Sequence, residues 1–151
     1  MTNQWPVSTL RETHRARLLR HFLALDLDDR RLRFGSALNE HALGTYVEHI
    51  DFTRDAVLGV FVGFELAGVA HVSEIGGAAE IGLSVLAGFR RRGLGDALLS
   101  RAMRMAHAWG VAGVRILVLP ENVAMIRLAR RHGLHADQGG TDGWITYRAA
   151  A

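Results

Sequence analysis

The strongest local pattern in this chain lies in residues 80–111, which read EIGLSVLAGFRRRGLGDALLSRAMRMAHAWGV. Apolar residues alternate with small or polar ones over residues 81–85, and this period of two predicts a strand. Over residues 94–109 apolar residues instead return every three or four positions, which predicts one face of a long helix. Residues 90–95 therefore form the turn between a strand and the start of a helix.

That turn reads RRRGLG and has the features of an anion-binding site. The first N–H groups of a helix have no partners within the helix, and the helix dipole places partial positive charge there. Gly93 and Gly95 let an anion approach the main chain closely, and Arg90, Arg91 and Arg92 add donors suited to phosphate. We predict a phosphate-binding turn, with a solvated arginine loop as the alternative.

The N-terminal third predicts two helices. A capping-box spacing that starts at Thr9 predicts a first helix over about 10–25, and apolar residues at i, i+4 and i+7 from Leu43 predict a second. The periodic pattern is interrupted over 26–34, where we expect no element. Residues 7–10 are a candidate edge strand.

The middle and end of the chain alternate between strand and helix patterns. Residues 56–64 and 66–75 are rich in valine and predict a hairpin with its turn at 65–68, and Gly76 and Gly77 predict a further turn before residue 80. After the long helix we expect a strand over 115–119, a helix from an Asn122 cap to His132, and strands over 134–138 and 143–149. This order predicts an α/β or α+β fold with a mixed sheet.

The composition excludes several kinds of chemistry. The 151 residues contain no cysteine, which excludes disulfides and thiolate sites. All 18 basic residues are arginine, so no lysine is present to form a Schiff base or a P-loop. The formal charge of +3 gives little support to nucleic-acid binding.

Length and the N-terminal sequence indicate a single domain over 1–151 in the cytoplasm. A chain of this size is long enough to bury one continuous core. Residues 1–6 do not start a basic and then apolar leader, and no apolar run approaches the about 20 residues of a membrane-spanning helix. We therefore expect no membrane association.

The RRRGLG turn matches the R/Q-x-x-G-x-G/A pyrophosphate loop of the GNAT acetyltransferase superfamily, which this chain resembles. The likeness continues through the long helix and through residues 118–134, VLPENVAMIRLARRHGL, and covers about 56–135. It implies the acyl-CoA N-acyltransferase fold, with a mixed, mostly antiparallel sheet of about six to seven strands and about four helices. It also implies an N-acetyltransferase with acetyl-CoA as cosubstrate.

The resemblance implies where acetyl-CoA binds. In the family the strand before the loop separates from the next one, and its free main chain pairs with the pantetheine arm. The pyrophosphate lies on the loop, and an asparagine that opens the following helix contacts the cofactor. The implied cofactor-binding residues are Leu83, Val85, Arg90, Arg91, Arg92, Gly93, Leu94, Gly95 and Asn122; no metal is expected.

The resemblance also implies direct attack of an amine on the thioester, without an acyl-enzyme. Glu80 aligns with a glutamate that is the general base in some members, although a strand glutamate is also a common structural residue. His71 is the second candidate for the base. The usual acid is a tyrosine at the position of Ala129, so Tyr46, Tyr147, His132 or another group takes its place, or the thiolate leaves without a donor.

The acceptor is the part that the sequence leaves open. We expect a small-molecule or peptide amine, and Glu40, Glu48, Asp51 and Asp55 are candidates for attracting a cationic one, if they are not simply solvated. A homodimer is expected because homodimers are frequent in the family. The alternatives are a catalytically inactive acetyl-CoA-binding or sensing protein, which Ala129 favours, and a basic nucleic-acid-binding module.

Overall fold

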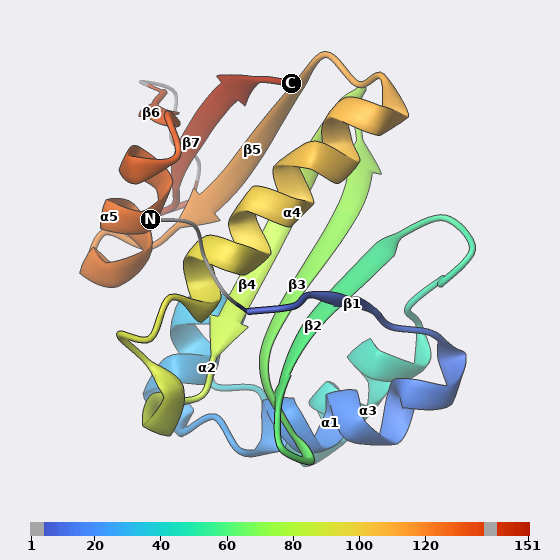
Figure 1. Cartoon of the computed structure of the whole chain (residues 1–151). Helices are drawn as coiled ribbons and strands as arrows, with labels where there is room; N and C mark the ends of the chain where they lie inside the picture. Colours follow the sequence, from blue (N-terminus) through green and yellow to red (C-terminus); the bar gives the residue numbers. More distant parts are fainter. Residues whose placement is uncertain (1–4, 138–141) are drawn as a thin grey trace.

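The structure, a computed structural model that describes residues 5–137 and 142–151, is built on a seven-stranded sheet (Figure 1). The strand order is β1-β2-β3-β4-β5-β7-β6, and each neighbouring pair is antiparallel except β4 and β5. The strands are β1 (Ser8–Thr9), β2 (Ala56–Val62), β3 (Glu65–Ile75), β4 (Ala78–Val85), β5 (Gly113–Val118), β6 (His135–Ala136) and β7 (Ile145–Ala150). This confirms the predicted α/β class with a mixed, mostly antiparallel sheet.

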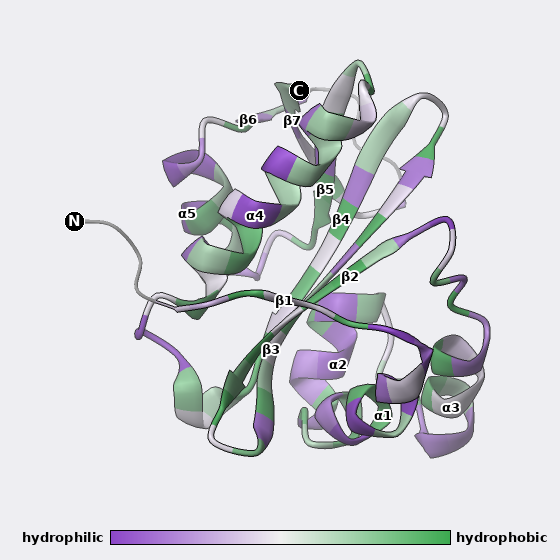
Figure 2. Cartoon of the chain, turned by 45° about the vertical axis from the view of Figure 1, so that its right-hand side comes forward, coloured by the Kyte–Doolittle hydropathy of each residue, from purple (hydrophilic) through white to green (hydrophobic). Residues whose placement is uncertain are grey.

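The helices of the described residues cover both faces of this sheet. They are η1 (Glu12–His14), α1 (Arg15–Leu23), α2 (Leu27–Phe34), α3 (Glu40–Glu48), η2 (Ala87–Phe89), α4 (Leu94–Trp109) and α5 (Val123–Arg131). On β2, Leu58 packs in the core with α4 and α5, whereas its neighbour Val57 packs in the core with α1 and α3. Figure 2 shows green and purple on different sides of α4, as expected for a helix with one buried face.

The parallel strands β4 and β5 stay together for only two residues. Ala79 lies opposite Val114 and Glu80 lies opposite Arg115, and no further pair follows in the described strands. Figure 1 shows the strands diverging from there toward their C-terminal ends. Because open α/β sheets bind ligands at the carboxyl ends of their parallel strands, this divergence is where a functional site is expected.

Helix α2 is the element that the sequence pattern failed to predict. No residue of this helix is buried, and Leu27 is 62% exposed, so it has no apolar stripe. Its ends are nevertheless marked in the sequence. The Asp26 carboxylate accepts a hydrogen bond from the Asp29 N–H at 2.8 Å, and Gly35 ends the helix with φ of 88°. With α2 the described residues form five α-helices, in agreement with the about four that were expected.

The predicted start of the first helix is also wrong. Thr9 belongs to β1 and does not cap a helix. The chain turns after Arg11, whose N–H donates to His14 Nδ1 at 2.9 Å, so the helix predicted over 10–25 is divided into η1 and the shorter α1.

The β2–β3 hairpin turns earlier than predicted. Residues 65–68 belong to β3, and the turn is made by Gly63 and Phe64, with Gly63 in the left-handed region at φ of 63°. The remaining predicted elements are confirmed, although position 138 of the strand expected over 134–138 lies outside the described residues. Within the described part of the chain, no helix combines the length and apolar character of a membrane span.

A buried histidine joins α1 to the centre of the sheet. His21 is 2% exposed; its Nδ1 lies 2.8 Å from the Leu66 carbonyl and its Nε2 lies 2.8 Å from Ser84 Oγ. The carbonyl can only accept, so Nδ1 carries the proton and Nε2 accepts from the serine hydroxyl. Burial lowers the pKa of His21 from 6.5 to about 4.

This shift predicts acid sensitivity. Between pH 6.5 and about 4, His21 binds a proton in the unfolded state but not in the folded state. This residue should therefore lower the free energy of unfolding by about 3 kcal/mol as the pH is lowered through this range. Urea unfolding at several pH values measures this slope. His21→Gln, whose amide can replace both hydrogen bonds, should flatten it, while the exposed-residue control His107→Gln should keep it. An unchanged slope in His21→Gln would contradict the assignment.

Candidate active site

A cavity of about 290 Å³ lies at the divergence of β4 and β5. It extends from α2 and α3, across β3 and β4, to β5 and the start of α5. The polar side chains on its wall are those of Arg33, Tyr46, His71, Ser73, Glu80 and Asn122. Apolar side chains, including Leu83, Ile116 and Trp144, form much of the remainder.

The main chain of β4 faces this cavity with part of its hydrogen-bonding groups. The Leu86 N–H donates to the Ala67 carbonyl of β3 at 2.9 Å, which fixes the alternation along the strand. Residues 80, 82 and 84 therefore direct their main-chain groups to β3, and residues 81, 83 and 85 direct theirs to the side of β5. Beyond Arg115, β5 no longer pairs with β4, so among the described residues this side of β4 has no neighbouring strand. Leu83 and Val85 thus direct main-chain groups to this side of β4, where the Val85 carbonyl accepts a hydrogen bond from Arg90 Nε at 3.2 Å.

The RRRGLG turn lies at the end of the same strand. Gly93 precedes α4 with φ of 88°, and Arg91 also has a positive φ of 62°, so the main chain winds tightly into the helix. A Cβ on Gly95 would lie 3.2 Å from Leu128 of α5, so the glycine lets α4 and α5 approach closely. Arg92 lies over the Phe89 ring at 5.4 Å. Arg90, in contrast, turns away to an ion pair 2.8 Å from Asp29.

Two ion pairs connect α2 to both sides of the divergence. Asp29 holds Arg90 at the end of β4, and Arg31 contacts Glu121 in the turn after β5 at 3.2 Å. Exposed pairs of this kind contribute about 0.2–1 kcal/mol each. The helix that the sequence did not predict is therefore part of the site.

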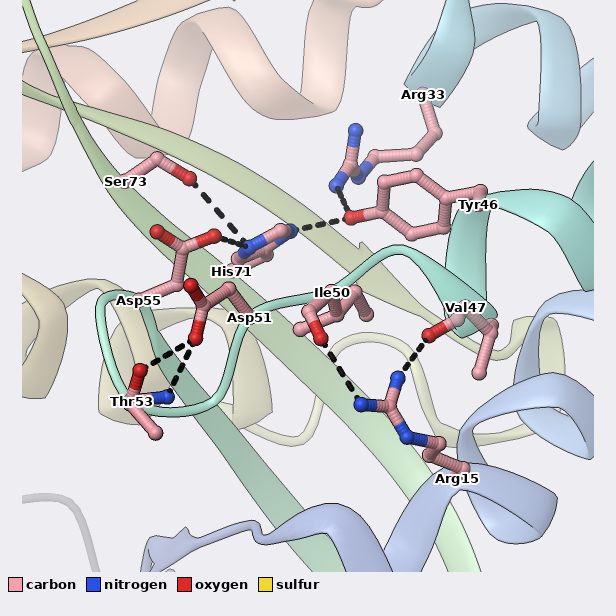
Figure 3. A network of polar contacts seen from close by, with 10 residues as sticks. All are labelled: Arg15, Arg33, Tyr46, Val47, Ile50, Asp51, Thr53, Asp55, His71 and Ser73. Atoms are coloured by element: carbon pink, nitrogen blue, oxygen red, sulfur yellow. Dashed lines mark hydrogen bonds and ion pairs between the residues drawn. The ribbon is translucent and has the colours of Figure 1, made fainter.

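A chain of hydrogen bonds links Arg33, Tyr46, His71 and Asp55 (Figure 3). Asp55 Oδ2 accepts from His71 Nε2 at 2.8 Å, so Nδ1 is left to accept from the Tyr46 hydroxyl. The Tyr46 oxygen in turn accepts from Arg33 Nη2 at 3.1 Å. The imidazole thus donates from one ring nitrogen and accepts at the other, as a neutral His71 does.

The surroundings of His71 act on its pKa in opposite directions. Burial lowers the pKa of His71, the hydrogen bond to Asp55 raises it, and the charge of Arg33 lowers it further. The balance is a pKa below the usual value, so the imidazole is an available proton acceptor near neutral pH.

Loop contacts fix this chain of residues in place. Arg15 of α1 donates to the carbonyls of Val47 and Ile50, which holds the end of α3 (Figure 3). Asp51 accepts from the main chain and hydroxyl of Thr53, which shapes the turn that leads to Asp55. Of the acidic residues expected to attract an amine, Asp55 alone contacts the described cavity wall, through His71.

Glu80 lies on the cavity wall but is paired. Its Oε1 is 3.1 Å from Arg115 Nε, across the last residue pair of β4 and β5, and its side chain is 31% exposed. Residue register places Glu80 opposite Ser73 and Gly82 opposite His71 on the same face of the sheet. Glu80 and His71, the two candidate bases, therefore share one cavity.

The other predicted residues divide between cavity and framework. Asn122 lines the cavity and caps α5, accepting from the Met125 N–H at 3.2 Å. Ala129 and Tyr147 are buried in the core, and His132 binds Asp96 on α4 at 2.9 Å, all outside the cavity wall. Tyr46 is thus the one proposed replacement acid that the structure places in the cavity. Within the described residues, no group of three metal-binding side chains was found.

Arg33 and Gly82 are among the cavity residues that the sequence analysis missed, as are Ser73 and Trp144. A Cβ at Gly82 would lie 2.4 Å from Arg33 Cζ, so any other residue there would displace the guanidinium from its present place on β4. The two residues are 49 positions apart in the chain, and no local pattern connects them. The only available signal was a glycine inside a predicted strand, which often marks a close approach.

Comparison with known proteins agrees with this geometry. Residues 24–134 match the family model described as the acetyltransferase (GNAT) family, whereas no curated protein sequence matches the chain. The GNAT domain of S. lividans PAT is 21% identical, with a TM-score of 0.84 over 96% of this chain and 89% of that one.

Two further solved structures share the fold at low identity. PaiA N-acetyltransferase from Thermoplasma acidophilum in complex with coenzyme A is 14% identical, with a TM-score of 0.73 over 100% of both chains. The ribosomal-protein-S18-alanine N-acetyltransferase from Escherichia coli is 20% identical, with a TM-score of 0.72 over 96% of this chain and 92% of that one.

The opposing influences on His71 can be separated by substitution. Asp55→Asn removes the charge that raises the pKa of His71, so this pKa should fall further below 6.5. Arg33→Gln removes the charge that lowers it, so the pKa should rise. NMR titration of the His71 ring measures both, with the exposed Asp142→Asn as control. Shifts of the same sign in the two variants would show that the hydrogen-bond chain is not as described.

Proposed function

This chain belongs to the GNAT acetyltransferase family, and we propose that it transfers the acetyl group of acetyl-CoA to a primary amine of a small molecule or peptide. The observation that carries the proposal is the divergence of β4 and β5, with an arginine- and glycine-rich helix start at its end. The diverging strand offers main-chain partners for an extended arm, and the helix start offers N–H groups and positive charge for a phosphate.

The residues of the cleft fit acetyl-CoA. The main chain of Leu83 and Val85 would pair with the pantetheine arm, and residues 90–95 would hold the pyrophosphate. Asn122 lies on the cavity wall as the N-cap of α5. When bound, acetyl-CoA supplies a thioester carbonyl that an amine can attack.

The proposed chemistry needs one group to take a proton and one to return it. The amine nitrogen forms a bond to the carbonyl carbon, the carbon–sulfur bond breaks, and the amine loses a proton. We assign the proton acceptance to Glu80, directly or through water, with Arg115 holding its carboxylate in position. His71 is the alternative acceptor in the same cavity.

Tyr46 is the proposed proton donor to the departing sulfur. It takes the role left open by Ala129, and it is the phenol on the described cavity wall. The phenolate that remains after donation would be stabilised by the hydrogen bond from Arg33 Nη2 and would regain a proton from solvent.

Binding of acetyl-CoA is the first test. Isothermal calorimetry should show binding that weakens at least about tenfold when Arg90, Arg91 and Arg92 are changed to alanine, because the turn loses positive charge and donors beside the phosphate. A matched control changes the exposed Arg20, Arg54 and Arg104 to alanine, which removes the same charge elsewhere. Equal weakening in both triple variants would attribute the effect to net charge and contradict a specific loop site.

Release of free thiol with a panel of amines tests catalysis. Glu80→Gln should lower kcat by about a hundredfold or more, as expected for loss of a general base, while Glu74→Gln on an exposed part of β3 should not. If His71→Asn instead removes activity and the low-pH limb of the rate profile, the base is His71. Binding of acetyl-CoA without thiol release for any amine would favour the inactive, binding-only alternative.

A further inference from the structure

Arg33 is the cavity cation that lacks a counter-charge. Most of the arginines with described contacts around it are committed: Arg31, Arg90 and Arg115 form ion pairs with carboxylates. Arg33 is half-buried and forms no ion pair among the described residues; its one hydrogen bond goes to the Tyr46 hydroxyl at 3.1 Å. A guanidinium has five N–H donors, so four remain for another partner.

The residues around Arg33 fix the position of its guanidinium. It packs beside the Phe34 ring, with its Cζ 4.6 Å from the ring centroid, and it rests on β4 where Gly82 provides the room. Figure 3 shows one terminal nitrogen directed to Tyr46 and the other directed away from it. The Tyr46 hydroxyl is hydrogen-bonded to His71, so the donors free for a ligand at this end of the cavity are those of Arg33. A half-buried cation held in this way favours an anionic partner.

Glu80 places a negative charge on the cavity wall, separate from the positive charge of Arg33. Glu80 and Gly82 are two residues apart on β4, or about 7 Å along the strand. An acceptor that bridges the two ends would place its amine at Glu80 and an anion at Arg33. The short separation suits an amine and an anion only a few bonds apart.

We infer that Arg33 binds a carboxylate of the acceptor, which makes the acceptor an amine of the free amino-acid type; the inference rests on the proposed acetyl transfer. One cation matches the single charge of a carboxylate, whereas a phosphate carries about −1.5 to −2 at neutral pH. The planar fork of the guanidinium also matches a carboxylate in a bidentate contact. Polyamines and other amines without an anion are disfavoured by the same charge.

The test compares amino acids with their α-carboxamides as acceptors. The wild-type protein should show kcat/KM about tenfold to a hundredfold higher for the carboxylates, as expected for a hydrogen-bonded charge, and Arg33→Gln should remove this preference. The α-amine of a carboxamide is less basic and more reactive at neutral pH, so intrinsic reactivity cannot imitate the result. Arg20→Gln, an exposed substitution on α1, is the matched control and should keep the preference.

A second variant tests the geometry without removing the charge. Gly82→Ala places a methyl group 2.4 Å from the present position of Arg33 Cζ and so displaces the guanidinium. It should raise KM for carboxylate acceptors, while the calorimetric Kd for acetyl-CoA serves as a check on folding. Equal use of carboxylates and carboxamides by the wild type, or a preference that survives in Arg33→Gln, would overturn the inference while leaving acetyl transfer intact.

A binding measurement keeps the inference testable if no amine is turned over. Calorimetry with an N-acetyl amino acid and its carboxamide, with and without coenzyme A, should show tighter binding of the carboxylate that is lost in Arg33→Gln. Equal binding of the two compounds would overturn the carboxylate site. Absence of thiol release, by contrast, counts against the proposed function alone, so the two failures are distinguishable.

Discussion

The pairing of β4 with β5 ends at Glu80 and Arg115, and the remainder of the site depends on that interruption. A strand in the middle of a sheet normally has both edges satisfied, and main-chain groups left without partners carry a free-energy cost. Beyond Glu80 the outer edge of β4 is open, and the cavity occupies this space. The ion pair between Glu80 and Arg115 lies where β4 and β5 begin to diverge. The last residue pair that joins the two strands therefore also positions the proposed base.

Helix α2 is exposed, yet its side chains contact both sides of the divergence between β4 and β5. It contributes little to either core, yet Asp29 and Arg31 reach the loops at the ends of β4 and β5, and Arg33 lies on the cavity wall. A helix with polar residues all round is typical of a segment held by specific contacts rather than by apolar burial. Its amphipathic neighbours α1 and α3 supply the packing that places Tyr46 beside His71.

The sequence allowed prediction of those elements that are determined by residues close to one another in the chain. The strand, turn and helix of residues 80–111 follow from periodicity, and the Asn122 cap is a short-range hydrogen bond, so both were found. Helix α2 was missed because the prediction relied on apolar periodicity, although its caps at Asp26 and Gly35 were visible. The contact of Arg33 with Gly82 joins distant parts of the chain, and such tertiary contacts leave no periodic trace. Candidate residues such as Glu80 and His71 were recognised singly, but their common cavity required the fold.

The exclusive use of arginine has a consequence for the durability of the molecule. An acetyl thioester reacts slowly with any neutral lysine amine, and each such event would erase a positive charge and the ion pair it supports. The cationic partners of the ion pairs described above are arginine or histidine, and arginine remains protonated and non-nucleophilic at working pH. The side chains that join α2 to the ends of β4 and β5 are therefore chemically inert toward the acetyl thioester that the family uses.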